Sequence, residues 1–150
     1  MVRKMTPKKY LEQIQELEWS IYVNQEAIQR VKDRMDIKGL SYDKDRVQTS
    51  PQDTMPDLIA NLIRLEEVTD NKRIYLEEMM TVITNQIELM ENVLDKKILY
   101  MRYVKGLSLY AVSKKLHYSY DYIRHRHGMA LQRFEKKHAP LERITHNSTF

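Results

Sequence analysis

The side chains best suited to chemistry lie in the last third of the chain, between residues 99 and 131. Arginine, lysine, histidine and tyrosine recur there, and Asp121 supplies the one carboxylate. Arginine can donate to both acceptors on the guanine edge, and histidine or tyrosine can donate to bases or phosphates. The residues expected to face DNA bases are Tyr120, Asp121, Tyr122, Arg124 and His125.

A second group of side chains is expected to hold phosphates, which positions a protein on DNA without reading its sequence. Ser119 joins this group because it begins the basic helix, and the N-terminal end of a helix is electropositive. The expected phosphate contacts are Ser119, Lys114, Lys115, Arg102, Lys105 and Arg133.

Three helices must position these groups. The pattern predicts a first helix over 93–105, closed by Gly106, and a second helix capped by Ser108. His117 and Tyr118 form the turn, and Ser119 caps a third, basic helix. Residues 93–138 are therefore predicted to form a helix-turn-helix unit whose last helix enters the major groove. The residues expected to face inward are Leu109, Val112, Leu116, Ile123, Ala130, Leu131 and Phe134.

Charge is distributed unevenly along the chain. Residues 95–150 hold twelve Lys or Arg and four Asp or Glu, a charge of +8, whereas residues 1–94 carry −4. All five histidines also follow residue 95. A basic segment of this kind is typical of proteins that bind polyanions, although solvated helices also carry charge.

Residues 1–92 are predicted to form a long antiparallel helical hairpin, a coiled coil. Thr6 and Pro7 favour a helix start, and Gly39 is predicted to end that helix. A second helix opens at Thr54–Asp57 with a capping pattern. Two apolar seams with alternating gaps of four and three residues follow. The first is Tyr10, Ile14, Leu17, Ile21, Asn24, Ile28, Val31 and Met35, and the second is Leu58, Leu62, Leu65, Thr69, Lys72, Leu76, Met79, Ile83, Gln86, Met90 and Val93.

The register of this hairpin is predicted from its polar positions. Pairing the two seams places Asn24 opposite Thr69, and a matched polar layer fixes register at a cost in stability. Alternatively, each seam meets its copy in a second subunit. We expect a homo-oligomer in either case, because a narrow two-helix seam buries little surface. Trp19, Tyr22 and Tyr75 lie off the seams and extend the apolar surface.

The basic segment resembles region 4 of bacterial sigma factors. The matching residues are Gly106-Leu107-Ser108, Lys115-Leu116, Tyr118-Ser119 and Ala130-Leu131. Over nearly its full length the chain resembles the ArpU/RinA-like phage transcriptional regulator family, through Tyr10–Ile14, Asp45–Val47, Leu99, Arg102-Tyr103 and His127-Gly128. The resemblance implies control of late phage or prophage genes, with RNA polymerase as a possible partner.

One residue departs from the family pattern. Arg126 stands between the inward positions Ile123 and Ala130, where the family usually has an apolar side chain. A buried unpaired guanidinium is costly. Either Arg126 therefore extends to the surface or the third helix is slightly rotated, and its contact with DNA is left open.

Several function classes find no support in the sequence. No Gly-rich phosphate loop or nucleophile triad is present, and His125 and His127 point to different helix faces, so we expect no enzyme, metal, cofactor or small-molecule substrate. No apolar run suits a membrane span or a signal peptide, so we expect a cytoplasmic protein of a bacterial host cell without membrane contact. Residues 139–150 are predicted to be a flexible tail.

The most direct hypothesis is a sequence-specific DNA-binding transcriptional regulator, with double-stranded DNA as its partner. The alternative is a phage small terminase-like subunit, which recognises a DNA packaging site and forms a ring. A purely structural hairpin protein is the third reading, and it would leave the basic segment without a partner. Mass measurement separates a monomer or dimer from a ring.

Overall fold

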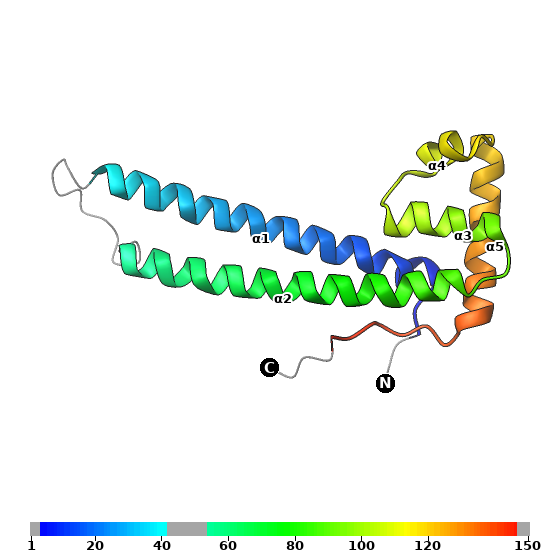
Figure 1. Cartoon of the computed structure of the whole chain (residues 1–150), viewed down its shortest axis with the longest axis horizontal. Helices are drawn as coiled ribbons and strands as arrows, with labels where there is room; N and C mark the ends of the chain where they lie inside the picture. The colour runs from blue at the N-terminus through cyan, green and yellow to red at the C-terminus, as the bar shows by residue number, and fades with distance from the viewer. Residues whose placement is uncertain (1–3, 42–53, 147–150) are drawn as a thin grey trace. The chain divides into compact units, whose positions relative to one another are not determined.

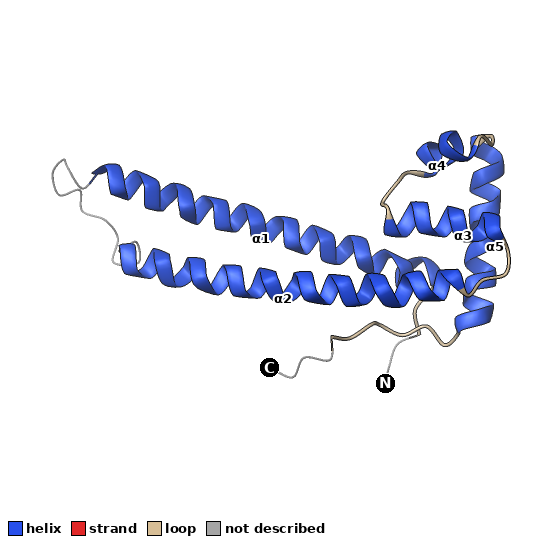
Figure 2. Cartoon of the chain, viewed as in Figure 1, coloured by secondary structure: helices blue, strands red, loops and turns tan. Residues whose placement is uncertain are grey.

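The structure, a computed structural model, describes residues 4–41 and 54–146. Every regular element in these ranges is helical, which confirms the predicted all-α class (Figures 1 and 2). The elements are α1 (Pro7–Ser41), α2 (Met55–Glu88), α3 (Val93–Leu99), the π-helical turn η1 (Tyr100–Val104), α4 (Leu109–Leu116) and α5 (Tyr120–His138).

The chain forms two compact units whose bounds differ from the predicted domains 1–92, 93–138 and 139–150. The first unit comprises Met1–Leu17 and Tyr75–Phe150, and the second comprises Glu18–Ile74. The first unit therefore contains the beginning of α1 and the end of α2 together with α3, α4 and α5. This division differs from the predicted boundary near residue 92, since Phe134 of α5 and Tyr10 of α1 belong to one apolar cluster.

The starts of the long helices follow the predicted capping residues. The Lys9 amide donates to Oγ1 of Thr6 at 3.3 Å, and the Asp57 amide donates to Oγ1 of Thr54 at 3.4 Å. The predicted end of α1 at Gly39 is wrong, since the helix continues to Ser41. Glycine weakens a helix by only about 1 kcal/mol, so a single one does not have to end it.

The core of the first unit is broader than the predicted seams. Ile14, Ile83 and Met90 are buried as predicted, and so are Leu11 and Ile87, which lie beside the seams. The core widens because α5 and the residues after it also pack on α1 and α2, through Phe134 and Leu141 among others. Val93 is wrong as a seam residue: it begins α3 and is largely exposed.

In the second unit, α1 and α2 run in opposite directions (Figure 1). Polar side chains make contacts between them. Nζ of Lys72 donates to Oγ of Ser20 at 2.7 Å. Nζ of Lys32 lies 3.8 Å from Oε1 of Glu66.

Neither residue of the predicted polar layer is fully exposed to solvent. Thr69 is fully buried and Asn24 is half-buried. The Thr69 hydroxyl donates to the Leu65 carbonyl of its own helix at 2.6 Å, which satisfies it locally. The pairing of Asn24 with Thr69 stays a prediction.

Residues 139–146 pack within the first unit, which differs from the predicted flexible tail. Leu141 is buried, and its carbonyl accepts a hydrogen bond from the Met5 amide at 2.9 Å. The Ile144 amide donates to Oε1 of the buried Gln13 at 3.0 Å, and the Ile144 carbonyl accepts from the Tyr75 hydroxyl. Apolar side chains at 141 and 144 explain why this segment packs. Residues 147–150 lie outside the described part of the chain.

Candidate nucleic-acid interface

The candidate interface is built on the junction between α4 and α5. Ser108 caps α4, its hydroxyl accepting from the Ala111 amide at 3.1 Å, and Ser119 caps α5, accepting from the Tyr122 amide at 3.2 Å. Both caps confirm the predictions. His117 ends α4 in the left-handed conformation with φ of 59°, and Gly106 before α4 has φ of 73°. Positive φ is easily adopted by glycine, which explains Gly106 at that turn.

A small apolar cluster fixes these helices to α3. Ile98 of α3, Val112 of α4 and Ile123 of α5 are fully buried against one another. Leu109 and Leu116 pack around them, partly buried. The inward faces predicted from the sequence are therefore present, and they determine which side of α5 faces solvent.

The predicted base-reading residues all lie on the exposed side of the first turns of α5. Tyr120, Asp121, Tyr122 and His125 are exposed, and 67% of the Arg124 side chain is accessible. Arg124 lies 3.8 Å from Asp121 in an exposed ion pair. An exposed ion pair of this kind stabilises a protein by only about 0–1 kcal/mol. Arg124 can therefore leave Asp121 at little cost and bind a stronger partner.

Two exposed tyrosines outside the predicted set extend this surface. Tyr118 stacks on Tyr122 with ring centroids 5.0 Å apart, and Tyr110 of α4 meets Tyr120 at 6.4 Å. Nζ of Lys114 lies 5.2 Å from the centre of the Tyr110 ring. The helical spacing of the sequence leaves Tyr110 off the inward face of its helix. That position was the signal that could have identified Tyr110 as a surface residue.

The predicted phosphate contacts divide into two groups. Lys105, Lys114 and Lys115 are exposed, and Ser119 stands at the start of α5. Arg102 is half-buried, and it donates to the Leu107 carbonyl at 3.2 Å. Arg133 is tied to Asp95, as described next. The two arginines therefore make hydrogen bonds within the fold, whereas Lys114 lies over the exposed Tyr110 ring.

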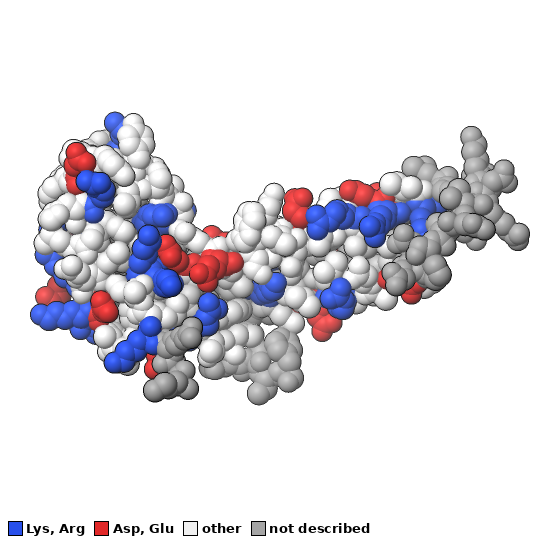
Figure 3. All heavy atoms as spheres, turned by 180° about the vertical axis from the view of Figure 1, so that it is seen from behind, with Lys and Arg blue, Asp and Glu red and all other residues white. Residues whose placement is uncertain are grey.

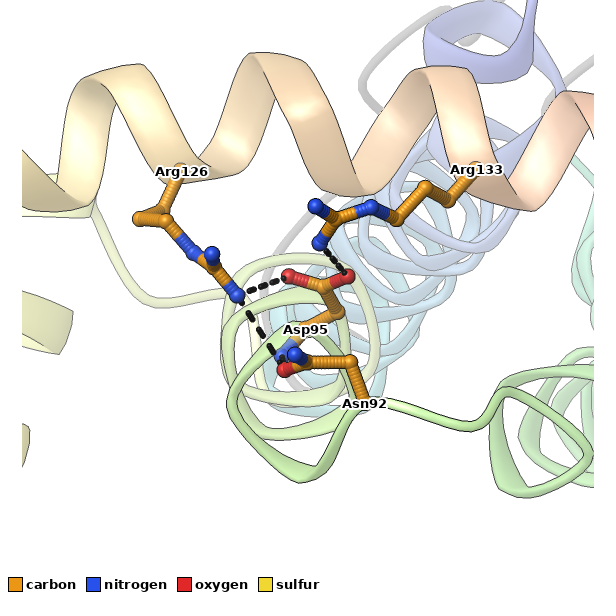
Figure 4. Close-up of polar contacts among 4 residues, drawn as sticks. All are labelled: Asn92, Asp95, Arg126 and Arg133. Atoms are coloured by element: carbon orange, nitrogen blue, oxygen red, sulfur yellow. Dashed lines mark hydrogen bonds and ion pairs between the residues drawn. The ribbon is translucent and has the colours of Figure 1, made fainter.

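A buried carboxylate holds α5 against α3 (Figure 4). Asp95 is fully buried, and its two oxygens accept from Arg126 Nη2 at 2.9 Å and from Arg133 Nη1 at 2.6 Å. Arg126 also donates to Oδ1 of Asn92 at 3.1 Å, and Asn92 caps α3 through the same oxygen. Only 16% of the Arg126 side chain is exposed, against 42% for Arg133.

This network resolves the question that the sequence left open for Arg126. The guanidinium turns inward from α5 and finds a counter-charge, so it neither extends to the surface nor lies unpaired. Its Nε atom is a buried donor that has no hydrogen-bond partner in the described residues. Because both arginines point toward Asp95 in Figure 4, we do not assign Arg126 to a DNA contact.

A second buried polar pair lies further along α5. Nε2 of His127 is 2.8 Å from the hydroxyl of Tyr103, and the two rings stack with centroids 5.7 Å apart. Burial, with Arg102 and Lys8 nearby, lowers the pKa of His127 to about 4. Burial raises the pKa of Tyr103 to about 12. Both groups are thus neutral near pH 7.

A groove of about 630 Å³ lies beside the Asp95 network. Asn92, Asp95 and Arg133 line it together with two lysines of the last turn of α5, Lys136 and Lys137. Sequence reasoning did not single out these lysines, although a basic run at the end of a helix was visible. Their ammonium groups add positive charge to the side of α5 that carries Arg133.

Comparison with protein-family models, with curated proteins and with solved structures finds no match for this chain. Across residues 4–41 and 54–146, no three histidine or acidic side chains gather in a way that could hold a metal ion. No helix in the same ranges combines the length and apolar character needed to cross a bilayer.

Proposed function

We propose that this protein is a sequence-specific binder of double-stranded DNA in which α4 and α5 act as a helix-turn-helix. The first turns of α5 enter the major groove, which admits an α-helix and presents a distinct pattern for each base pair. Tyr120, Asp121, Tyr122, Arg124 and His125 contact base edges. Lys105, Lys114 and Lys115 contact phosphates, with the N-terminal end of α5 at Ser119.

One observation carries this proposal. The five base-reading candidates are all exposed, while Ile123 between them is fully buried and anchors the helix to its neighbours. A reading helix requires both properties, because a mobile helix would lose affinity in ordering itself on DNA. The Asp95 network adds a second anchor through Arg126 and Arg133, which follow the reading residues along α5.

We further propose that DNA binding serves transcriptional control of phage or prophage late genes. The resemblance to the ArpU/RinA-like family and to sigma region 4 supports this role and suggests RNA polymerase as a protein partner. Self-association is proposed through α2, where the apolar side chains of Ile63 and Ile74 are exposed.

Two substitutions test the proposed reading surface. Arg124→Ala should lower the ratio of specific to non-specific affinity, because a bidentate contact to guanine discriminates by about 1–3 kcal/mol. Lys114→Ala should weaken binding to every sequence and flatten the dependence of log affinity on log salt by about one unit per bound chain. Fluorescence anisotropy on DNA fragments selected from the source genome measures both effects.

Matched controls are available on α2 and α1. Arg73 pairs with Asp70 three residues earlier, as Arg124 pairs with Asp121, and Lys32 is an exposed lysine paired with Glu66. Arg73→Ala and Lys32→Ala should leave DNA binding unchanged. If Arg124→Ala and Lys114→Ala bind like these controls, α5 is not the reading helix.

A further inference from the structure

The second unit carries a groove whose lining is basic, although its sequence is net acidic. Residues 18–74 hold nine Lys or Arg and eleven Asp or Glu. A groove of about 290 Å³ lies between α1 and α2, and the described residues that line it include three arginines and no carboxylate. They are Ala27, Arg30, Val31, Arg34, Asn61, Arg64 and Leu65. Figure 3 shows basic side chains in a row on one face of this part of the chain.

The arginines flank an apolar floor. Val31 is buried and Leu65 half-buried, and together with Ala27 they form the bottom of the groove. Arg30, Arg34 and Arg64 are exposed above it. Nη2 of Arg64 donates to Oδ1 of Asn61 at 2.7 Å, and both residues line the groove. The groove thus offers apolar contact and charge together.

The same face continues into exposed apolar residues. Trp19, Val23, Ala27, Arg30 and Arg34 follow one another at gaps of four, four, three and four, so they lie on one stripe of α1. The Trp19 side chain is 65% exposed and stacks on Tyr22 with centroids 5.3 Å apart. On α2, the exposed Val68 lies one turn beyond Arg64.

The residue types on this surface indicate which kind of partner binds in the groove. Tryptophan, tyrosine and arginine are the residues enriched in the energetic centres of protein interfaces. DNA phosphates would use the arginines but gain nothing from the apolar floor and Trp19. A two-fold contact centred on this groove would bring its arginines toward their own copies, and like charges across an interface cost several kcal/mol.

We propose that this groove docks an acidic amphipathic helix of another protein. A third helix fits the groove between two antiparallel helices, as in a helical bundle. Its carboxylates pair with Arg30 and Arg64, and its apolar side chains lie on Val31 and Leu65 and extend toward Trp19. This docking surface is separate from the DNA-reading surface of α5 and does not depend on the proposed function.

The single tryptophan of the chain makes the test direct, because Trp19 borders the surface. The probe is a synthetic helical peptide of about 20 residues (about 30 Å long) with leucine on one face and glutamate on the other. Titration into the full-length protein should shift Trp19 emission to shorter wavelength and saturate. A peptide with lysine in place of glutamate should not bind.

Variants locate the binding and separate the occupants. Arg30→Glu/Arg64→Glu should weaken peptide binding at least about tenfold, whereas Arg73→Glu, outside the groove, should not. Circular dichroism checks that each variant is folded. DNA affinity and molar mass are measured in parallel.

Four results would overturn the proposal. Absence of saturable peptide binding, or equal binding by the groove variant, removes the docking site. A loss of DNA affinity in the groove variant assigns the arginines to nucleic acid. A change in molar mass assigns the surface to a second copy. None of these results bears on Arg124 or Lys114, so the proposed function stands or fails separately.

Discussion

At the scale of single residues, Asp95 connects the packing of the helices to the surface of α5. Its carboxylate is fully buried and accepts from two arginines of α5 that lie two turns apart. A buried charge is tolerated only when it is paired, and removing one partner leaves the other charges uncompensated. The network therefore fixes the rotation of α5 as well as its position, which decides which side chains face outward.

Because Asp95 is fully buried, replacing it should lower the stability of the fold strongly. We expect Asp95→Asn to lower the free energy of unfolding by about 3 kcal/mol, because Arg126 then remains buried without a counter-charge. Urea unfolding measures the loss. Asp121→Asn is the matched control, since that carboxylate is exposed and its removal should stay within about 0.5 kcal/mol. Equal effects of the two substitutions would contradict a structural role for the network.

The His127–Tyr103 pair predicts a dependence of stability on pH. The pKa of His127 is about 4 in the folded chain, below its ordinary value of 6.5. As pH falls from about 6.5 to about 4, the unfolded chain binds a proton that the folded chain does not. Stability therefore decreases over this window.

The variant His127→Gln isolates this contribution from the other groups that titrate. The difference in unfolding free energy between the wild type and His127→Gln should be constant above pH 6.5 and should decrease from there to pH 4. Titration of the ring protons by NMR gives the pKa directly. A midpoint near 6.5 would mean that the ring is not buried in solution.

These residues also mark the limit of sequence reasoning at this scale. The exposure of Arg124 and the caps at Ser108 and Ser119 follow from local spacing, which helical periodicity dictates. The pairing of Arg126 with Asp95 joins residues 31 positions apart. No local rule connects them, so the sequence predicted the cost of burying Arg126 but not the partner that offsets it.

At the scale of elements, the segment after α5 acts as part of the core. Leu141 is buried, and the segment hydrogen-bonds to Met5, Gln13 and Tyr75. Composition alone predicted a frayed end here, because the segment is short and polar. Whether such a segment packs depends on a surface formed by α1 and α2 far away in the sequence, which periodicity within the segment cannot reveal.

Truncating Leu141 tests this packing. Leu141→Ala should lower the free energy of unfolding by about 2 kcal/mol or more, because it removes buried methyl groups and leaves a cavity. Thr145→Ala, at an exposed position, should change it by less than about 0.5 kcal/mol. DNA affinity should be the same in both variants, since the segment lies away from α4. A Leu141→Ala protein as stable as Thr145→Ala would show that the segment does not pack in solution.

At the scale of the whole molecule, charge is organised by surface rather than by sequence half. The sequence predicted a basic half and an acidic half, and the exposed lysines near α4 agree with the first. The arginine groove of the second unit lies within the net-acidic half. Summed charge could not reveal it, because helical folding brings arginines three or four residues apart onto one face of a helix.

The salt dependence of DNA binding and the molar mass together give the number of chains that bind one DNA site. Lys105, Lys114 and Lys115 are exposed, so one bound chain should give a slope of log affinity against log salt of about −3. A dimer on two half-sites should give about −6, and Lys114→Ala should then flatten the slope by about two units. Light scattering on the free protein and on the complex supplies the mass independently.

A dimer with the steeper slope agrees with the regulator, whereas a ring of about eight to ten chains would favour the packaging subunit. A slope near zero would mean that the exposed lysines do not contact phosphates, and the proposed DNA interface would be wrong.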